Sequence, residues 1–168
     1  MTSDVRIRPA RTGDVPAIRD LVDAYAPDRR LLSKATVALY EDLPEFLVAQ
    51  DSAGVVVGCG AMHVMWEDLG EVRTVAIAPD RARQGIGGRL LDGLLQRARD
   101  IGVERVFALT FETEFFARHG FVEIDSAPVS HETFEQLLRS YDEGVAEFLD
   151  LERVKPNTLG NVRMLCVL

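Results

Sequence analysis

A glycine-rich turn joins an apolar strand to a long amphipathic helix near the middle of the chain, and this junction limits the folds the sequence can adopt. The apolar stretch Val75–Ile77 stops just before Pro79, which cannot donate to a continuing β-ladder. A helix is predicted from Gly85 to Ile101, because its apolar residues recur on one face: Ile86, Leu90, Leu91, Leu94, Leu95, Ala98 and Ile101. Such a helix buries its stripe against a sheet, so the segment predicts a strand–turn–helix unit in a layered fold.

Further strands and helices are predicted along the rest of the chain. Apolar runs and apolar–polar alternation predict strands at residues 5–8, 45–50, 55–64, 71–77, 103–109, 121–124 and 161–168. Helical spacing predicts helices at residues 15–25, 36–43, 112–119 and 131–138. No linker or repeat interrupts them. We therefore predict an α/β (α+β) fold in a single domain over residues 1–168, built on one mixed sheet.

Charge and cysteine content exclude several classes of protein. The 168 residues carry 27 acidic and 19 basic side chains, a net charge of -8. Such a chain is poorly suited to binding nucleic acid or an anionic membrane, because both need clustered Lys and Arg. No apolar run approaches the roughly 20 residues of a membrane span, and the N-terminal residues lack the features of a signal peptide. Cys59 and Cys166 lie among apolar residues, which predicts reduced core thiols in a cytoplasmic protein.

The turn itself has the composition of a phosphate-binding loop. Arg81, Arg83 and Arg89 are basic, and no acidic residue lies between Arg81 and Leu91. Backbone N–H groups at a helix N-terminus are unpaired, and glycines let a phosphate approach them closely. A Walker sequence and the third glycine of a dinucleotide fingerprint are both absent. We predict that a pyrophosphate is held by Arg83, Gln84, Gly85, Ile86, Gly87 and Gly88; the alternative is a tight turn with solvated arginines.

Two segments resemble motifs of the GNAT N-acetyltransferase superfamily. The segment from Val75 to Leu90 resembles its acetyl-CoA-binding motif, and Thr110–Phe121 resembles its helix that ends in Gly-Phe. A closer resemblance is to N-acetylglutamate synthases of the short, single-domain bacterial form. The segments that carry it are Leu31–Lys34, Gly58–Met62, Gly70–Ala76, Leu109–Phe121, Val154–Asn157 and Arg163.

The resemblance implies a GNAT fold with a mostly antiparallel central sheet. It also implies direct transfer of acetyl from acetyl-CoA to the α-amino group of L-glutamate, without an acyl-enzyme, at the head of arginine biosynthesis. The backbone of Val75, Ala76 and Ile77 would pair with the pantetheine arm. Glu71 would be the general base; the alternative is a structural residue at the strand end. Two positions depart from the family pattern: Ala82 replaces an Arg or Gln, and Phe116 stands where many relatives have a proton-donating tyrosine.

Glutamate carries two carboxylates, so its pocket needs cations. The candidates are Lys34, Arg73, Lys155 and Arg163, with Asn157 as a further contact. Their alternative is the solvated surface, where most Lys and Arg lie. His63 is interpreted as part of the core or of the pocket wall. The histidines have no metal-ligand spacing, so no metal is predicted.

Other functions remain open at this point. One alternative is a non-catalytic acyl-CoA sensor, which the absence of a tyrosine at Phe116 favours. Within the enzymes, the alternatives are acetylation of glutamine, of another amino acid or of a protein N-terminus. Exposed strand edges in this fold often pair, so a homodimer is a further hypothesis.

Overall fold

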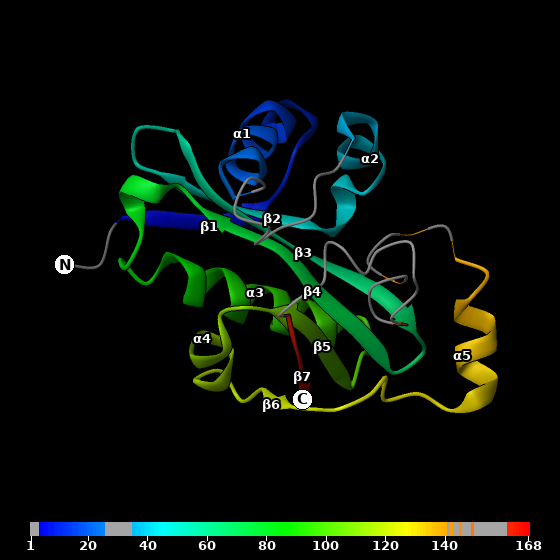
Figure 1. The fold of residues 1–168 in the computed structure, drawn as a ribbon. Coiled ribbons are helices and arrows are strands. Elements are labelled where there is room, and N and C mark those ends of the chain that lie inside the picture. The colour runs from blue at the N-terminus through cyan, green and yellow to red at the C-terminus, as the bar shows by residue number, and fades with distance from the viewer. Residues whose placement is uncertain (1–3, 26–34, 141, 143–144, 146–148, 150–160) are drawn as a thin grey trace.

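A twisted sheet of seven strands organises the residues that the computed structural model describes, which are 4–25, 35–140, 142, 145, 149 and 161–168 (Figure 1). Its strand order is β1-β2-β3-β4-β5-β7-β6. All neighbours run antiparallel except β4 and β5, which run parallel. The strands are β1 (Val5–Pro9), β2 (Phe46–Asp51), β3 (Val56–Trp66), β4 (Leu69–Ile77), β5 (Arg105–Thr110), β6 (Val122–Glu123) and β7 (Val162–Val167). The predicted mixed sheet is confirmed.

Helices cover both faces of this sheet. In Figure 1, α1 and α2 lie above it and α3 and α4 below it, while α5 lies beyond the far end of β3 and β4. The α-helices are α1 (Val15–Tyr25), α2 (Thr36–Glu41), α3 (Ile86–Asp100), α4 (Thr113–Ala117) and α5 (His131–Leu137). Short 3-10 turns are η1 (Thr12–Asp14), η3 (Leu43–Glu45) and η4 (Pro79–Arg81). Among the described residues, no helix is both long and apolar enough to cross a membrane.

The apolar stripe of α3 forms the centre of the larger core. Ile86, Leu90, Leu91 and Leu94 are each at most 1% exposed, and burying each contributes roughly 1.5–3 kcal/mol. The helix lies so close to β3 that a Cβ added to Gly58 would come within 3.0 Å of the Leu90 side chain. Close packing of α3 therefore explains a glycine inside an otherwise apolar strand.

A second core lies under α1 and α2 on the opposite face. Ile18 and Val22 of α1 and Leu39 of α2 are fully buried against Cys59 and Ala61 of β3. Because side chains alternate along a strand, Ala61, His63 and Met65 share this face of β3. The α1–α2 face is therefore also the face of the polar side chains described below.

An irregularity in β4 separates it from β5. The β3–β4 register shifts between Cys59/Ala76 and Ala61/Arg73, and Thr74 in the shifted stretch has a φ of 58°. Pairing with β5 is confined to Leu69–Glu71 against Arg105–Phe107, although β4 continues to Ile77. The last six residues of β4 thus have no strand partner on the β5 side, which leaves a gap with an open backbone edge.

Candidate functional site

The turn between β4 and α3 contains two residues in the left-handed backbone region. Arg83 has a φ of 61°, and Gly85, the N-cap of α3, has a φ of 79°. Turns of this kind aim successive N–H groups to one side, and the helix adds the positive end of its dipole. A Cβ built on Gly85 would meet no atom within 4 Å. The N–H groups are therefore accessible, and the turn suits an anionic group such as a phosphate.

The arginines of this turn divide into two roles. Arg81 donates from Nη1 to Asp51 Oδ2 at 3.0 Å and from Nε to Gln84 Oε1 at 3.2 Å. It therefore fixes the turn, and the Gln84 side chain is occupied by that contact. Arg83 and Arg89 are exposed and have no ion pair within the described part of the chain. Their charges remain available to a ligand, which fits the predicted pyrophosphate-binding loop.

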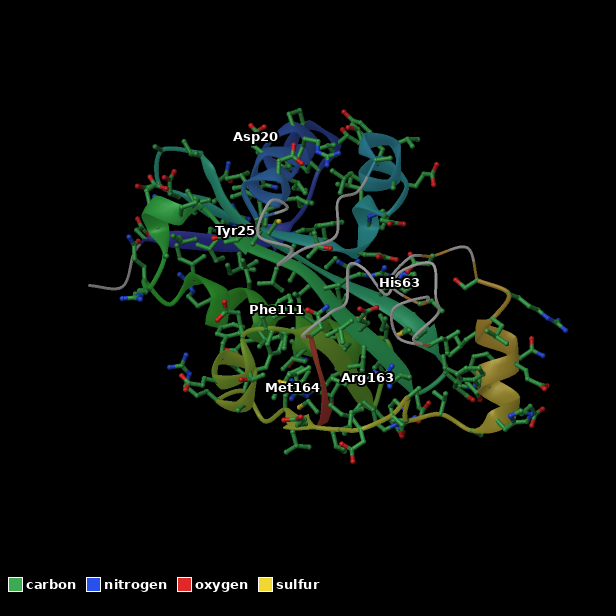
Figure 2. All side chains as sticks on the ribbon, in the orientation of Figure 1. Asp20, Tyr25, His63, Phe111, Arg163 and Met164 are labelled. Atoms are coloured by element: carbon green, nitrogen blue, oxygen red, sulfur yellow. The ribbon has the colours of Figure 1, made fainter. Side chains whose placement is uncertain are left out.

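The open edge of β4 begins where this turn ends. Ala76 pairs with Cys59, and the Ala78 N–H donates to the Val57 carbonyl at 2.8 Å. Since backbone groups alternate between the two edges of an antiparallel strand, those of Ile77 point away from β3, into the gap. Tyr25 lies at the end of α1 (Figure 2). Its hydroxyl donates a hydrogen bond to the Ile77 carbonyl. An extended arm carrying amides would find backbone partners on this edge.

Helix α4 brings aromatic rings to the side of the gap where α3 begins. Phe116 is 6% exposed and packs edge-to-face on Phe115 and Phe121, with centroids 5.2 and 5.0 Å apart. Phe115 lies beside the start of α3, 3.4 Å from the position of a Cβ on Gly87. Phe116 is thus a core residue with no proton to donate.

Five charged or titratable side chains gather on the α1–α2 face, near the start of the gap. Arg73 Nη1 donates to Asp142 Oδ1 at 2.6 Å, and Arg73 Nε lies 3.9 Å from Glu71 Oε2. His63 and Glu71 are directly opposed on β3 and β4, so their side chains share a face. His63 Nδ1 lies 2.5 Å from Glu45 Oε1. We call Glu45, His63, Glu71, Arg73 and Asp142 the charged cluster.

Burial makes the charges of this cluster interdependent. The Arg73 and Glu71 side chains are 8% and 5% exposed. Burial by itself would lower the pKa of Arg73, but the charges of Glu71 and Asp142 raise it above its usual value. Burial would likewise raise the pKa of Asp142, yet the charge and hydrogen bond of Arg73, with the charge of His63, lower it. Arg73 therefore stays a cation and Asp142 a carboxylate at neutral pH.

Arg73 retains donors for a ligand. Its Nε and Nη2 atoms are buried and have no hydrogen-bond partner in the described part of the chain. A buried guanidinium with unused donors is costly unless a ligand or water completes it. Two parallel N–H groups of this kind match a carboxylate. Arg73 is therefore positioned to bind an anion on this face.

Arg163 lies on the same face, beyond β5. On β7, Arg163 is directly opposed to Leu109 of β5, and Leu165 is opposed to Phe107 of β5. Phe107 is in turn opposed to Glu71 of β4. These pairings place Arg163 two strands away from β4 at the level where the gap opens (Figure 2). It is half-buried and forms no ion pair with a described residue. Lys34, Lys155 and Asn157 lie outside the described residues.

Three contributors to this face were not singled out in the sequence. Glu45 and Asp142 are separated from their partners by 18 and 69 residues, so only the fold reveals these pairs. Asn161, at the start of β7, has a buried Oδ1 with no hydrogen-bond partner among the described residues. For Asn161, the available signal was a polar residue at the first position of the strand predicted over residues 161–168.

The cysteines do not supply a nucleophile. Cys59 is fully buried, and burial raises the pKa of its thiol to about 12. It is therefore protonated at neutral pH and unreactive. Cys166 is also a buried free thiol, which confirms the core interpretation. Within the described ranges, no three His, Cys, Asp or Glu side chains form a group that could hold a metal ion.

A turn suited to an anion, an open strand edge and the charged cluster therefore lie around the gap between β4 and β5. The chain belongs to the acetyltransferase (GNAT) family, which it matches over residues 15–121. This confirms the GNAT fold and the family resemblance in the sequence.

Similar proteins extend the match over nearly the whole chain. An amino-acid acetyltransferase of Mycobacterium tuberculosis is 62% identical over 164 residues, covering 96% of this chain and 94% of that protein. A solved M. tuberculosis structure, in complex with CoA and a second ligand, has a TM-score of 0.94 at 61% identity over 97% of this chain and 99% of its own. An N-acetylglutamate synthase of Neisseria gonorrhoeae, solved with CoA and N-acetyl-glutamate, has a TM-score of 0.77 at 26% identity; the match covers 98% of this chain but 35% of that one.

Proposed function

We propose that the protein is an amino-acid N-acetyltransferase that moves acetyl from acetyl-CoA to the α-amino group of L-glutamate. The observation that carries this proposal is the position of Arg73. This buried guanidinium with unused donors stands next to the buried carboxylate of Glu71, where β4 leaves β5. An amine beside that carboxylate would face the open backbone edge from the α1–α2 side. Donor and acceptor would thus meet at one point in the gap.

The donor side has a specific assignment of residues. The turn from Arg83 to Gly88 would hold the pyrophosphate, with Arg89 adding charge. The backbone of Val75, Ala76 and Ile77 would pair with the pantetheine arm and orient the thioester, which supplies the activated acetyl group. Solved complexes of two similar proteins with CoA support this donor. Accessible N–H groups at the turn and an unpaired β4 edge are the features such a ligand requires.

On the acceptor side, Glu71 is the proposed base. Its carboxylate lies on the face where an amine would approach, and its Oε2 is 3.9 Å from Arg73 Nε. With Cys59 protonated and buried, the chemistry is direct attack of the amine on the thioester, without an acyl-enzyme. Positioning supplies most of the rate enhancement and proton removal the rest.

Arg73 and Arg163 are proposed to bind the two carboxylates of the substrate. They share a face and lie on either side of β5. Lys34, Lys155 and Asn157 remain proposed contacts on the basis of the sequence. The 62%-identical relative, an amino-acid acetyltransferase, supports an amino acid as acceptor, and the N-acetyl-glutamate complex of the N. gonorrhoeae protein supports glutamate. A role at the head of arginine biosynthesis in the cytoplasm follows as part of the same proposal.

Glutamine is the second candidate substrate, and one observation favours it. The charged cluster holds three carboxylates, Glu45, Glu71 and Asp142, against one permanent cation, Arg73. Asp142 already occupies Arg73 Nη1. The second carboxylate of glutamate would be repelled by this excess negative charge, whereas the neutral amide of glutamine would not be.

Release of free CoA decides between these functions. The protein is mixed with acetyl-CoA and each of a panel of free amino acids, and the CoA thiol is measured. Turnover with glutamate above all others supports the proposal, and turnover with glutamine above glutamate selects the second candidate. CoA binding with no release for any amino acid would identify an acyl-CoA sensor instead. A homodimer, which we also propose, is tested by the mass of the protein in solution.

A further inference from the structure

Acetylation of an amino acid by acetyl-CoA releases one proton. That this protein must remove such a proton rests on the proposed function. An α-ammonium group carries three protons. The product amide keeps one, and the CoA thiol takes a second after the carbon–sulfur bond breaks and the carbon–nitrogen bond forms. The third must leave the site for water in every turnover. The enzyme therefore needs a route for this proton as well as a base.

Glu71 is poorly placed to pass a proton directly to water. Its side chain is 5% exposed and lies beside the Arg73 guanidinium. A proton accepted there must be removed before the next cycle. On the same face, His63 is directly opposed to Glu71 in the neighbouring strand and its side chain is 20% exposed. His63 is thus the cross-strand neighbour of the proposed base, and its side chain is more exposed to solvent.

The contact with Glu45 prepares His63 for this task. A carboxylate only accepts hydrogen bonds, so His63 Nδ1, 2.5 Å from Glu45 Oε1, is the protonated ring nitrogen. Its other nitrogen, Nε2, is then the one free to accept a proton, and the adjacent carboxylate stabilises the imidazolium that forms. The second oxygen of Glu45 is buried without a hydrogen-bond partner among the described residues. Among the described residues, the side-chain hydrogen bond of Glu45 is thus the one to the His63 imidazole.

Most of the charged groups around His63 are carboxylates. Glu45 approaches from η3, Glu71 and Arg73 lie on β4, and Asp142 follows α5. Three of these four are carboxylates and one is a cation. The His63 ring thus lies among acceptors for a proton, and it is partly exposed to solvent.

We propose that His63, oriented by Glu45, is the exit for the reaction proton, accepting it from the buried base and releasing it to water. Replacement of His63 should slow turnover without weakening acetyl-CoA binding. It should also make turnover depend on small buffer molecules, which replace a missing proton carrier. A residue with a merely structural role would show no such dependence.

The test uses His63→Gln and Glu45→Gln in the full chain, with glutamate or whichever amino acid the native protein acetylates. We expect His63→Gln to lower kcat about tenfold or more, with the acetyl-CoA KM within a few-fold. Free imidazole should restore kcat in proportion to its concentration. The pH profile of kcat should differ between the native protein and each of the two variants, because both changes alter the proposed proton exit.

An exposed pair provides the matched control. His131 Nε2 lies 3.1 Å from Glu135 Oε1, with His131 88% exposed, so His131→Gln should leave kcat and its pH profile unchanged. The proposal would be overturned if His63→Gln turned over at the native rate without imidazole and kept the native pH profile. A slow His63→Gln protein that imidazole fails to restore would also overturn it. Absence of turnover in the native protein with every amino acid would instead refute the proposed function.

Discussion

The hydroxyl of Tyr25, the last residue of α1, donates a hydrogen bond to the carbonyl of Ile77 on the open edge of β4. The bond ties the α1–α2 layer to the strand edge that we assign to the pantetheine arm. It also supplies a partner to a carbonyl that has no strand neighbour on that side. The cofactor edge is thus set partly by a residue that reaches it from the acceptor side.

Removal of this hydroxyl should cost stability more than catalysis. Tyr25→Phe loses one half-buried hydrogen bond, which contributes about 1 kcal/mol and lowers the melting temperature by roughly 2–4 °C in a chain of this size. The acetyl-CoA KM should rise a few-fold while kcat stays within about twofold, because the hydroxyl positions backbone rather than reacting atoms. Thermal unfolding and steady-state kinetics measure both.

The half-exposed Tyr40 provides the control for this change, since Tyr40→Phe should alter neither quantity. A fall in kcat of a hundredfold in Tyr25→Phe would contradict the prediction. It would make Tyr25 the proton donor that Phe116 cannot be.

The proposed role of the Arg83–Gly88 turn in phosphate binding can be tested with a negative charge. Gly87→Asp places a carboxylate beside the accessible N–H groups, so the affinity for CoA should fall at least about tenfold, or 1.4 kcal/mol. Calorimetry with CoA measures this loss, and circular dichroism checks that the protein is folded, because a side chain at Gly87 would press on Phe115. Gly13→Asp adds the same charge where a Cβ meets nothing within 4 Å and should leave affinity intact. Unchanged affinity for CoA in a folded Gly87→Asp protein would refute the proposed pyrophosphate-binding role of this turn.

The elements were predictable where one local pattern dominates. Helix α3 was predicted over Gly85–Ile101 and is observed at Ile86–Asp100, because its apolar stripe repeats without interruption. The helix predicted at residues 36–43 divides into α2 and the 3-10 turn Leu43–Glu45, which contains Pro44. The strand predicted at residues 121–124 is only Val122–Glu123, at the edge of the sheet.

The site depends on features that have no local pattern. The gap follows from the register shift at Thr74. This β-branched residue has a left-handed backbone conformation that no neighbouring residue in the sequence predicts. The insertion of β7 between β5 and β6 brings Arg163 level with Arg73. Long-range topology of this kind cannot be read from spacing. The sequence places Glu71 and Arg73 on one strand, whereas the pairing of Arg73 with Asp142 and of His63 with Glu45 required the fold.

The proposed base gives a third prediction. Glu71→Gln keeps the shape of the side chain but removes its basicity and its charge beside Arg73. We expect kcat to fall about 100-fold or more, the usual scale of general-base catalysis, while the affinity for acetyl-CoA barely moves. Rapid-quench or steady-state kinetics and CoA calorimetry separate the two effects. Near-native turnover across the pH range would place the base elsewhere, and the exposed Glu67→Gln serves as the control.

Arg163 tests the substrate pocket. Removing a cation from a desolvated carboxylate typically costs about 2 to 5 kcal/mol. Arg163→Ala should therefore raise the glutamate KM by a factor of roughly 30 or more, since each 1.4 kcal/mol is tenfold, with the acetyl-CoA KM within a few-fold. Arg139→Ala, an exposed arginine without an ion pair in the described structure, should leave both constants unchanged.

Glutamine then assigns which carboxylate Arg163 binds. If Arg163 binds the side-chain carboxylate, glutamine has no charge there to lose, and its KM should rise less than that of glutamate. If Arg163 binds the α-carboxylate, both substrates should weaken equally, and Arg73, with its unused buried donors, is left to bind the side chain. Normal glutamate binding by Arg163→Ala would remove β7 from the pocket and leave the α1–α2 face of β3 and β4 as the acceptor site.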